Sequence, residues 1–488
     1  MHAARPALGL ALLCLLARPL AAWEDHARLS RLALGSESWA GSKVRAESLE
    51  AFLGAERSGL AGLLSGFEAR AAKELAYYPK LPAELAFRGE GEGPALRAAF
   101  LAAIRLNPDA KLILYLKPAP SAPRARPELP VDAVDPFDGR FENRPFESLA
   151  EGAELGALEV LATASDEPDY GLDCGLYEDN GTEAGSRYGL GEQPFGNPAL
   201  DYGSQAPLHM AFAHEDPIIG LAAPFTRRSL ADYRFRLYGE LARFAFGTGH
   251  PYWGYRFGGW ALHYVQDLCQ PYHASLLPGL SAFRILALNA FGSAADREAA
   301  LIFLSNRHSL VEDYAYRAVA AGQPEILAAL GGSEEGKAGL PPRDAAYRSG
   351  WLYDAVARRA FGRGRRLDAL LASSFPARYV SDPSYDYGLS NVGPTRDFDP
   401  YAALHAAGPE AAGALEGLLA ACLADAGSFS RSYLAYLLDE SAKPGPRRAP
   451  LDLRGPAYLA ILLALAALLL RSRRRSYARR ALREGGEL

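Results

Sequence analysis

Apolar residues recur every three or four positions over most of the chain, and alanine and leucine dominate the segments with this pattern. That period places apolar side chains along one face of an α-helix. Alternation of β-branched apolar and polar residues, which would indicate strands, is nearly absent. We therefore predict an all-α, multi-helix protein, with helical segments at residues 23–75, 94–106, 229–246, 253–270, 282–320, 344–371 and 411–438.

Two long segments between these helices lack the helical period. Residues 107–145 are rich in proline, which favours extended, exposed backbone. Residues 166–203 are rich in glycine, and we expect ligands or metal to order them rather than regular secondary structure. Both are long irregular insertions in the helical pattern, and connections of this length are functional or disordered.

The N-terminal residues have the pattern of a secretory signal peptide. Arg5 precedes an apolar run at residues 8–17, and two small residues end at Ala22. We predict a signal peptide at residues 1–22, so that cleavage makes Trp23 the mature N-terminus.

A second apolar run, residues 455–470, precedes a tail in which seven arginines lie between positions 471 and 483. As a helix this run is about 24 Å long, and Arg454 can extend the span by placing its charge at the membrane interface. We predict a single transmembrane helix at 455–470 and a basic cytoplasmic tail at 471–488. The large domain would then be exported, to a periplasmic or extracellular location, and held at the cell membrane.

Charge and cysteine content bear on two further questions, nucleic-acid binding and disulfide pairing. Residues 23–453 contain 42 basic and 55 acidic residues, a net charge of −13, and so strongly acidic a surface opposes broad binding of nucleic acid. Cys174, Cys269 and Cys422 follow the leader, and an odd number defines no disulfide framework. One pair among the three is compatible with the sequence, which does not determine which.

The strongest chemical signal lies in the segment 260–273. His263 and Asp267 are four residues apart, so on a helix both side chains leave the same face. Pro271 cannot continue a helix interior, and His273 therefore follows the helix end and is free to turn back toward that face. Imidazole and carboxylate at this spacing are metal ligands, and zinc suits the mixture best. A core helix with two buried histidines is the alternative, but a buried carboxylate there would be costly without a cation.

A second pair repeats this spacing further along the chain. His308 and Glu312 are again four residues apart, whereas Asp313 would point about 100° away on a helix. This pair predicts two more metal ligands, with a solvated helix face as the alternative.

The pattern of a small residue, Leu-His-Tyr, Asp, Gln-Pro and His at residues 259–273 resembles the zinc-dependent phospholipase C family and the related single-strand-specific zinc nucleases. The resemblance implies a helical catalytic domain at 23–330 with a cluster of three zinc ions. It also implies that the α-amino and carbonyl groups of an N-terminal tryptophan bind metal, here Trp23, with His26 as its partner, although the family histidine stands somewhat further from the tryptophan.

The resemblance further requires an aspartate and then a histidine upstream. Asp166, Asp169 and Asp173 are candidates for the first, and His209 or His214 for the second; we select Asp169 and His209. The implied sites are then, in turn, Asp169, His209, His263 and Asp267; His273, His308 and Glu312; and Trp23, His26 and the shared Asp267. His250 and His405 lack a carboxylate at ligand spacing and are expected to be structural or exposed.

The resemblance implies hydrolysis of phosphate esters, with Asp169 and Asp267 as the catalytic carboxylates. We expect a phospholipase C-type enzyme acting on a phospholipid or another phosphodiester, held at the membrane, with nucleic acid a less favoured substrate. A zinc nuclease or nucleotidase is the first alternative, and a zinc-stabilised surface binding protein with weak or no catalysis is the second. Residues 331–450 are expected to form a helical extension packed on the catalytic domain.

Overall fold

The computed structural model describes residues 23, 25–120, 122–135, 146–199, 201–332, 350–391 and 395–439, which all belong to one compact unit. The predicted signal peptide, transmembrane helix and basic tail lie outside these residues. Those three assignments therefore stay predictions.

Helices make up most of the protein, as the sequence pattern predicts: 63% of residues are helical and 3% are in strands. The first half of the described chain contains α1 (His26–Leu34), α2 (Leu49–Glu74), α3 (Gly93–Ala103), α4 (Ala157–Ser165), α5 (Glu183–Arg187), α6 (Asp201–His209) and α7 (Pro217–Ala222). The second half contains α8 (Ala231–Gly247), α9 (Pro251–Asp267), α10 (Pro271–Ala274), α11 (Ala282–Phe291), α12 (Ala294–Ala320), α13 (Pro324–Gly331), α14 (Arg358–Ser374), α15 (Ala377–Val380), α16 (Tyr387–Ser390), α17 (Pro400–Ala406) and α18 (Pro409–Leu438).

Short strands interrupt two segments that the sequence pattern assigns to helix or loop. β1 (Lys43–Arg45) divides the predicted helical segment 23–75 and pairs antiparallel with β5 (Glu154–Gly156). In the proline-rich segment and just after it, β4 (Phe146–Ser148) lies between β2 (Tyr115–Leu116) and β3 (Glu128–Leu129) in an antiparallel sheet. Each strand has two or three residues, too few for an alternating pattern to stand out in the sequence.

The predicted helical segment 282–320 is also divided, at residues 292–293. Gly292 ends α11 with extended backbone, and Ser293 starts α12 by accepting a hydrogen bond from the amide of Asp296. The Asp296 side chain in turn accepts from the amide of Ser293, which is the reciprocal pattern of a capping box.

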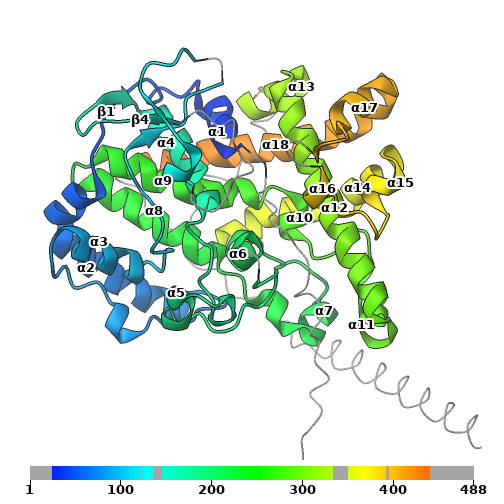
Figure 1. Ribbon diagram of the computed structural model, residues 1–488, viewed down its shortest axis with the longest axis horizontal. Coiled ribbons are helices and arrows are strands. Elements are labelled where there is room, and N and C mark those ends of the chain that lie inside the picture. The colour runs from blue at the N-terminus through cyan, green and yellow to red at the C-terminus, as the bar shows by residue number, and fades with distance from the viewer. Residues whose placement is uncertain are drawn as a thin grey trace, which may run out of the picture. The chain divides into compact units, whose positions relative to one another are not determined.

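Helix α9 is at the centre of the fold and is buried at every residue from Tyr252 to Asp267. It packs against α4, α8 and α18, which surround it (Figure 1). A helix that is apolar or aromatic on all sides is stable only when other elements cover it completely. Any polar group on α9 is therefore held in the interior of the protein.

Helix α18 joins the C-terminal part of the described chain to this core. It packs against α1, α8, α9, α13 and α14, so the residues after 330 contribute directly to the core around α9. Among the described residues, Ala412–Leu438 is the one stretch long and apolar enough to cross a membrane, but 67% of its most apolar window is buried inside the protein. This burial is typical of a core helix. The domain boundary at residue 330 stays a prediction.

Candidate metal centre

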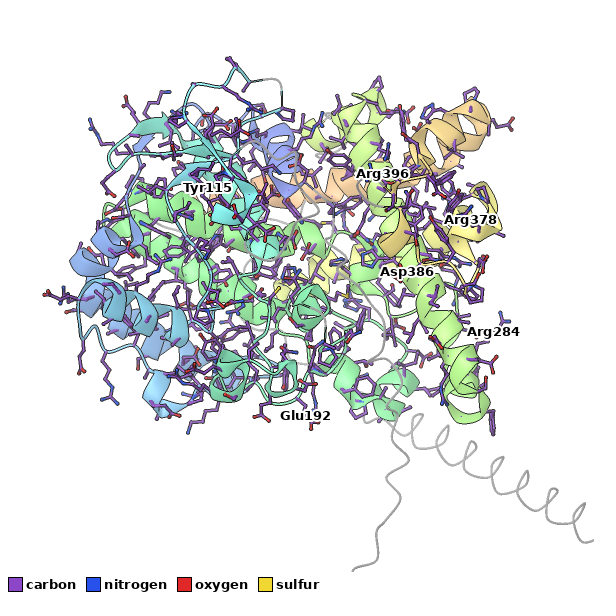
Figure 2. The ribbon with its side chains drawn as sticks, in the orientation of Figure 1. Tyr115, Glu192, Arg284, Arg378, Asp386 and Arg396 are labelled. Atoms are coloured by element: carbon purple, nitrogen blue, oxygen red, sulfur yellow. The ribbon has the colours of Figure 1, made fainter. Side chains whose placement is uncertain are left out.

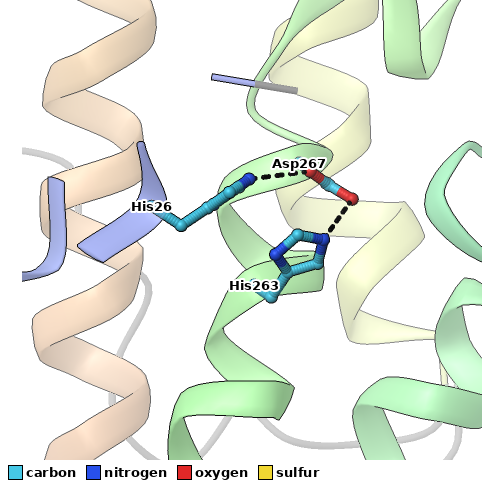
Figure 3. A group of neighbouring side chains, drawn as sticks. All are labelled: His26, His263 and Asp267. Atoms are coloured by element: carbon cyan, nitrogen blue, oxygen red, sulfur yellow. Dashed lines mark ion pairs between the residues drawn. The ribbon is translucent and has the colours of Figure 1, made fainter. Parts of the chain in front are cut away.

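The last turn of α9 carries the two residues that the sequence pattern places on one face. His263 Nε2 lies 3.2 Å from Asp267 Oδ2, and both side chains are fully buried (Figure 3). Nδ1 of His263 donates to the carbonyl oxygen of Ser165 on α4, at 2.9 Å. Because that carbonyl can only accept, Nδ1 carries a proton, and Nε2 is the ring nitrogen that faces Asp267.

The proline after α9 has the effect that the sequence predicts. α9 ends at Asp267, Gln270 adopts extended backbone, and Pro271 opens the short helix α10. This turn brings His273 back to the interior, where its Nδ1 donates to the carbonyl oxygen of His209 at 3.0 Å. Its Nε2 is buried and has no hydrogen-bond partner.

Helix α1 positions His26 against the end of α9. His26 Nε2 lies 3.4 Å from Asp267 Oδ1 (Figure 3). The same nitrogen lies 3.8 Å from Asp169 Oδ2, while Nδ1 donates to the side-chain oxygen of Gln266 at 2.8 Å. Gln266 is fixed in this orientation because its amide nitrogen donates to Ser30 Oγ at 3.0 Å. The first turn of α1 is therefore locked to α9 by Gln266.

The structure places Trp23 beside the same glutamine. Its indole is buried, and Nε1 donates to the backbone carbonyl of Gln266 at 3.1 Å. Its φ is +48°, in the left-handed region that a tryptophan rarely adopts. These contacts do not test the α-amino group that cleavage would create, so that ligand stays a prediction.

Asp169 and His209 complete the environment of His263. Asp169 lies in a short 3₁₀-helix, Glu167–Tyr170, and His209 is the last residue of α6. His209 Nδ1 lies 2.9 Å from Asp267 Oδ2, 3.0 Å from His263 Nε2 and 3.8 Å from Asp169 Oδ1. The glycine-rich segment thus supplies one side of the centre.

The structure gives the other upstream candidates different partners. Asp166 Oδ1 accepts from the amide of Ala27 in α1 at 3.0 Å, and its other oxygen pairs with Lys117. His214 Nε2 bonds the backbone carbonyl of Tyr353 at 2.7 Å. Of the candidates, Asp169 and His209 are therefore the two that face His263.

A third group forms where α10 meets α12. His308 Nε2 lies 2.7 Å from Glu312 Oε1, and His273 Nε2 lies 3.8 Å from the same oxygen. Gln270 donates to that oxygen at 2.9 Å, so the residue before Pro271 also orients Glu312. Asp313, the neighbouring acid, is also buried, but it pairs with Arg317 and not with the histidines.

These residues form three buried groups whose possible ligand atoms lie within 4.8 Å of one another: His26, His263 and Asp267; Asp169, His209 and His263; and His273, His308 and Glu312. The first two groups share His263. Eight of the nine residues predicted as ligands therefore converge from six separate segments of the chain, and the role of Trp23 stays a prediction.

Electrostatics in the first two groups require a positive charge. Burial lowers the pKa of His26, but Asp267 and the other nearby carboxylates outweigh burial and raise it to about 9. Burial also opposes the charged form of His209, whose pKa is nevertheless raised to about 10 by Asp173 and Asp267. For Asp267, burial favours the neutral acid, yet the surrounding histidines hold its pKa well below the usual range. Histidine nitrogens therefore face carboxylate oxygens in these two groups. Either protons on the histidines or a bound metal ion would supply the positive charge between them.

The third group differs, because burial dominates there. Burial lowers the pKa of His273 and of His308 to about 3, and raises the pKa of Glu312 well above its usual value. Neutral imidazole is the form that ligates metal. Two neutral histidines and one carboxyl, with His273 Nε2 unpaired, fit a divalent cation.

The sequence pattern did not reveal which residue contacts the second ring nitrogen of His209, Nε2. Asp173, one of the candidates not selected, lies 3.2 Å from His209 Nε2, accepts a hydrogen bond from Tyr264 Oη at 2.6 Å and forms an ion pair with Arg234 at 2.7 Å. Arg234 also donates to the carbonyls of Ile104 and Arg105. No spacing in the sequence links Asp173 to Arg234, which lie sixty-one positions apart.

The remaining histidines and the cysteines lie outside these groups. His250 pairs with Glu47 at 2.8 Å, and His405 pairs with Glu416 at 2.8 Å. Glu47 is 203 positions from His250 and Glu416 is 11 positions from His405, so neither carboxylate stands at the three- or four-residue spacing that the sequence analysis used. Cys174, Cys269 and Cys422 are buried, and none of the three forms a disulfide.

The fold and the site define a mostly helical protein with three buried histidine–carboxylate groups that can bind metal. Comparisons of the chain with protein-family models, with curated proteins and with solved structures find no match.

Proposed function

We propose that the protein is a zinc-dependent phosphoesterase, most similar in activity to a phospholipase C. The observation that supports this proposal most is the convergence of the three buried groups, two of which share His263. A single structural zinc site needs four ligands, whereas these groups supply more donors than one ion can use. The donor set, imidazole nitrogen and carboxylate oxygen, is the mixture that zinc accepts.

The residues would divide between metal binding and proton transfer. Zinc, when bound, would lower the pKa of a water molecule and neutralise charge on phosphoryl oxygens. The proposed metal ligands are Trp23, His26, Asp169, His209, His263, Asp267, His273, His308 and Glu312. Asp169 is the most exposed of these residues, at 8%, so it would be nearest to substrate and could also accept the proton of the attacking water.

We further propose a lipid rather than a nucleic acid as substrate. The predicted exported part has a net charge of −13, which opposes the electrostatic attraction that nucleic-acid binding uses. The apolar run at residues 455–470 would hold this part at a membrane with the basic tail in the cytoplasm. A phosphodiester in a lipid headgroup would then be available at high local concentration.

Metal content is the first test, and it has a matched control. Purified protein should contain about three zinc ions per chain. His308→Gln should lose about one zinc ion, because only His273 and Glu312 would remain as donors in that group. His405→Gln, which removes a histidine paired with a glutamate outside the groups, should retain the full content. One ion or none in the unmodified protein would contradict the cluster.

Hydrolysis of defined substrates is the second test. Phosphatidylcholine, single-stranded nucleic acid and a chromogenic phosphodiester should be compared, and the phospholipid should be hydrolysed fastest. Asp267→Asn keeps the size of the side chain but removes the charge that His26, His209 and His263 face. This variant should lose at least about a hundredfold in rate. Preference for nucleic acid would favour the nuclease alternative, and a zinc-loaded protein without hydrolysis would favour the binding protein.

A further inference from the structure

Helix α11 exposes two large aromatic side chains on the surface. Phe283 is 65% exposed and Phe291 is 79% exposed, and Leu221 on the adjoining helix α7 is 53% exposed. α7 and α11 contact each other, so the three residues belong to one region. Figure 1 places α7 and α11 at the lower right, at the edge opposite α2.

The exposed residues of α11 form a continuous face. At 100° per residue, Phe283, Arg284, Ala287, Ala290 and Phe291 fall within an arc of about 120°. Ile285 is buried on the opposite side, and Leu286 and Leu288 are partly buried. α11 is therefore apolar toward both the protein and its exterior, which is unusual for a helix that faces water.

Charge on this surface is positive, against the acidic balance of the rest of the protein. Residues 217–230, which include α7, contain no acid, and their charged residues are the exposed Arg227 and Arg228. Arg227 lies over α7, where a Cβ at Gly220 would meet its guanidinium at 2.2 Å. Residues 276–295 contain Arg284 and no acid, and Figure 2 shows Arg284 at the outer edge of α11. Acidic residues reappear at Asp216 and Asp296, the margins of the region.

This surface is built on the segments that carry two residues of the metal centre. Phe212 follows His209 by three positions, and Leu276 follows His273 by the same number. Both pack in one apolar cluster with Ile219 of α7 and Ile285 of α11. The exposed face of α11 therefore lies over an apolar cluster whose residues Phe212 and Leu276 are three positions from His209 and His273.

We propose that Leu221, Phe283 and Phe291, with Arg227, Arg228 and Arg284, form a surface that docks on an anionic lipid bilayer. Aromatic and leucine side chains on one face, with arginine beside them, are the composition of helices that lie in a membrane interface. The apolar side chains enter the boundary between headgroups and acyl chains, and the arginines bind anionic headgroups. The surface does not depend on hydrolysis, so its test is separate from that of the proposed function.

The length of chain that follows the described residues also favours a bilayer as the partner. Fifteen residues separate Asp439 from the apolar run that starts at Gly455. Fully extended they reach about 50 Å, so the folded unit would remain close to the membrane that the proposed anchor crosses. The same membrane could then cover the exposed face of α7 and α11, and no separate binding partner would be required.

Position-specific fluorescence on the full-length protein tests the proposal. A polarity-sensitive dye is attached to Phe291→Cys, to Phe283→Cys in a second protein, and to Ser58→Cys as the control. Ser58 is exposed on α2, at the opposite edge of Figure 1, and the three native cysteines that follow the predicted signal peptide, Cys174, Cys269 and Cys422, are buried. Each protein is reconstituted into vesicles of phosphatidylcholine with roughly one third phosphatidylserine.

The dye at positions 283 and 291 should shift to shorter wavelength in vesicles, relative to detergent. Lipids carrying a nitroxide should quench it at a depth of about 5–10 Å below the headgroups, while position 58 stays in water. Replacing Arg227 and Arg228 by glutamine should reduce the shift at position 291. A dye that remains in water at both positions would overturn the proposal, as would equal burial at position 58. Shielding that rises with protein concentration in detergent would show a contact with a second copy of the chain, and would also overturn it.

Discussion

Three histidines of the candidate metal centre are each held from behind by a second group. Ser165 orients His263, Gln266 orients His26, and the carbonyl of His209 orients His273. Such contacts fix which ring nitrogen faces the metal and raise the affinity of the site. Asp173 differs from the others, because it is a charged group that also pairs with Arg234 in the interior.

Asp173→Asn should therefore weaken metal binding and the fold together. The variant loses the carboxylate that faces His209 Nε2, so zinc affinity should fall about 10–100-fold. It also leaves Arg234 buried without its counter-ion, which should cost about 3 kcal/mol of unfolding free energy. Zinc titration and denaturant unfolding measure the two effects.

Tyr264→Phe is the control for this prediction, since it removes one hydrogen bond to Asp173 and keeps the charge. It should cost about 1 kcal/mol and leave zinc affinity nearly unchanged. An Asp173→Asn protein that binds zinc as tightly as the unmodified protein would show that Asp173 does not orient His209.

The histidines also predict how zinc and pH act together. In the metal-free protein the pKa of His26 is raised to about 9 and that of His209 to about 10, above the unfolded value of 6.5. Their contribution to stability is complete below pH 6.5 and is lost as pH rises through about 9 for His26 and about 10 for His209. Zinc competes with the same protons, so its affinity rises over that window.

The difference in melting temperature between zinc-loaded and chelator-treated protein should therefore widen from pH 6.5 to 9. Thermal denaturation at several pH values measures it directly. A difference that shrinks over this range would mean that His26 and His209 do not bind the metal.

At the scale of elements, the centre depends on how closely α4 approaches α9. Gly259 on α9 lies against the α4 backbone: a Cβ there would be 2.5 Å from the carbonyl oxygen of Leu161 and 3.0 Å from the amide nitrogen of Ser165. Ser165 also accepts the hydrogen bond from His263. The glycine therefore allows the contact that orients a metal ligand one turn later.

Gly259→Ala should push α4 away from α9. We expect a loss of about 1–3 kcal/mol in unfolding free energy, together with weaker zinc binding. Gly258→Ala is the matched control, because its Cβ would meet only side-chain methyl groups, at 3.4 Å and 3.9 Å. The control should be neutral or slightly stabilising, since alanine is the better helix former. Equal effects of the two substitutions would contradict the role given to the close approach at Gly259.

At the scale of the whole molecule, helices from both halves of the chain enclose α9. α18 packs on α1, α8 and α9, and Ser430 on α18 lies 3.5 Å from the amide nitrogen of Gln266. Residues after 330 are thus next to the contacts that position His26. The core around α9 therefore contains residues from both sides of residue 330.

A chain that ends at residue 330 should consequently fail to fold into a stable zinc-binding protein. Without α18, the apolar sides of α1 and α9 would be exposed to water, and that loss exceeds the marginal stability of a typical protein. Circular dichroism during thermal unfolding and zinc analysis measure the outcome. Cooperative unfolding with full zinc content in the shortened chain would instead establish an independent domain ending near residue 330.

The sequence by itself determined the helical class and the ligands that share a helix. His263 with Asp267, and His308 with Glu312, are close in space because one helical turn brings residues four apart together. The break at Pro271 follows equally from local backbone geometry. These features required no knowledge of how the helices pack.

Only the tertiary structure decided which residues join them from elsewhere. Asp166, Asp169 and Asp173 are equivalent by spacing, and their roles separate because Lys117 pairs with the first and Arg234 with the third. The short strands, the enclosure of α9 by α18 and the exposed face of α11 likewise depend on contacts between distant segments. Backbone geometry acts over a few residues, whereas these placements result from many weak contacts summed over the whole fold.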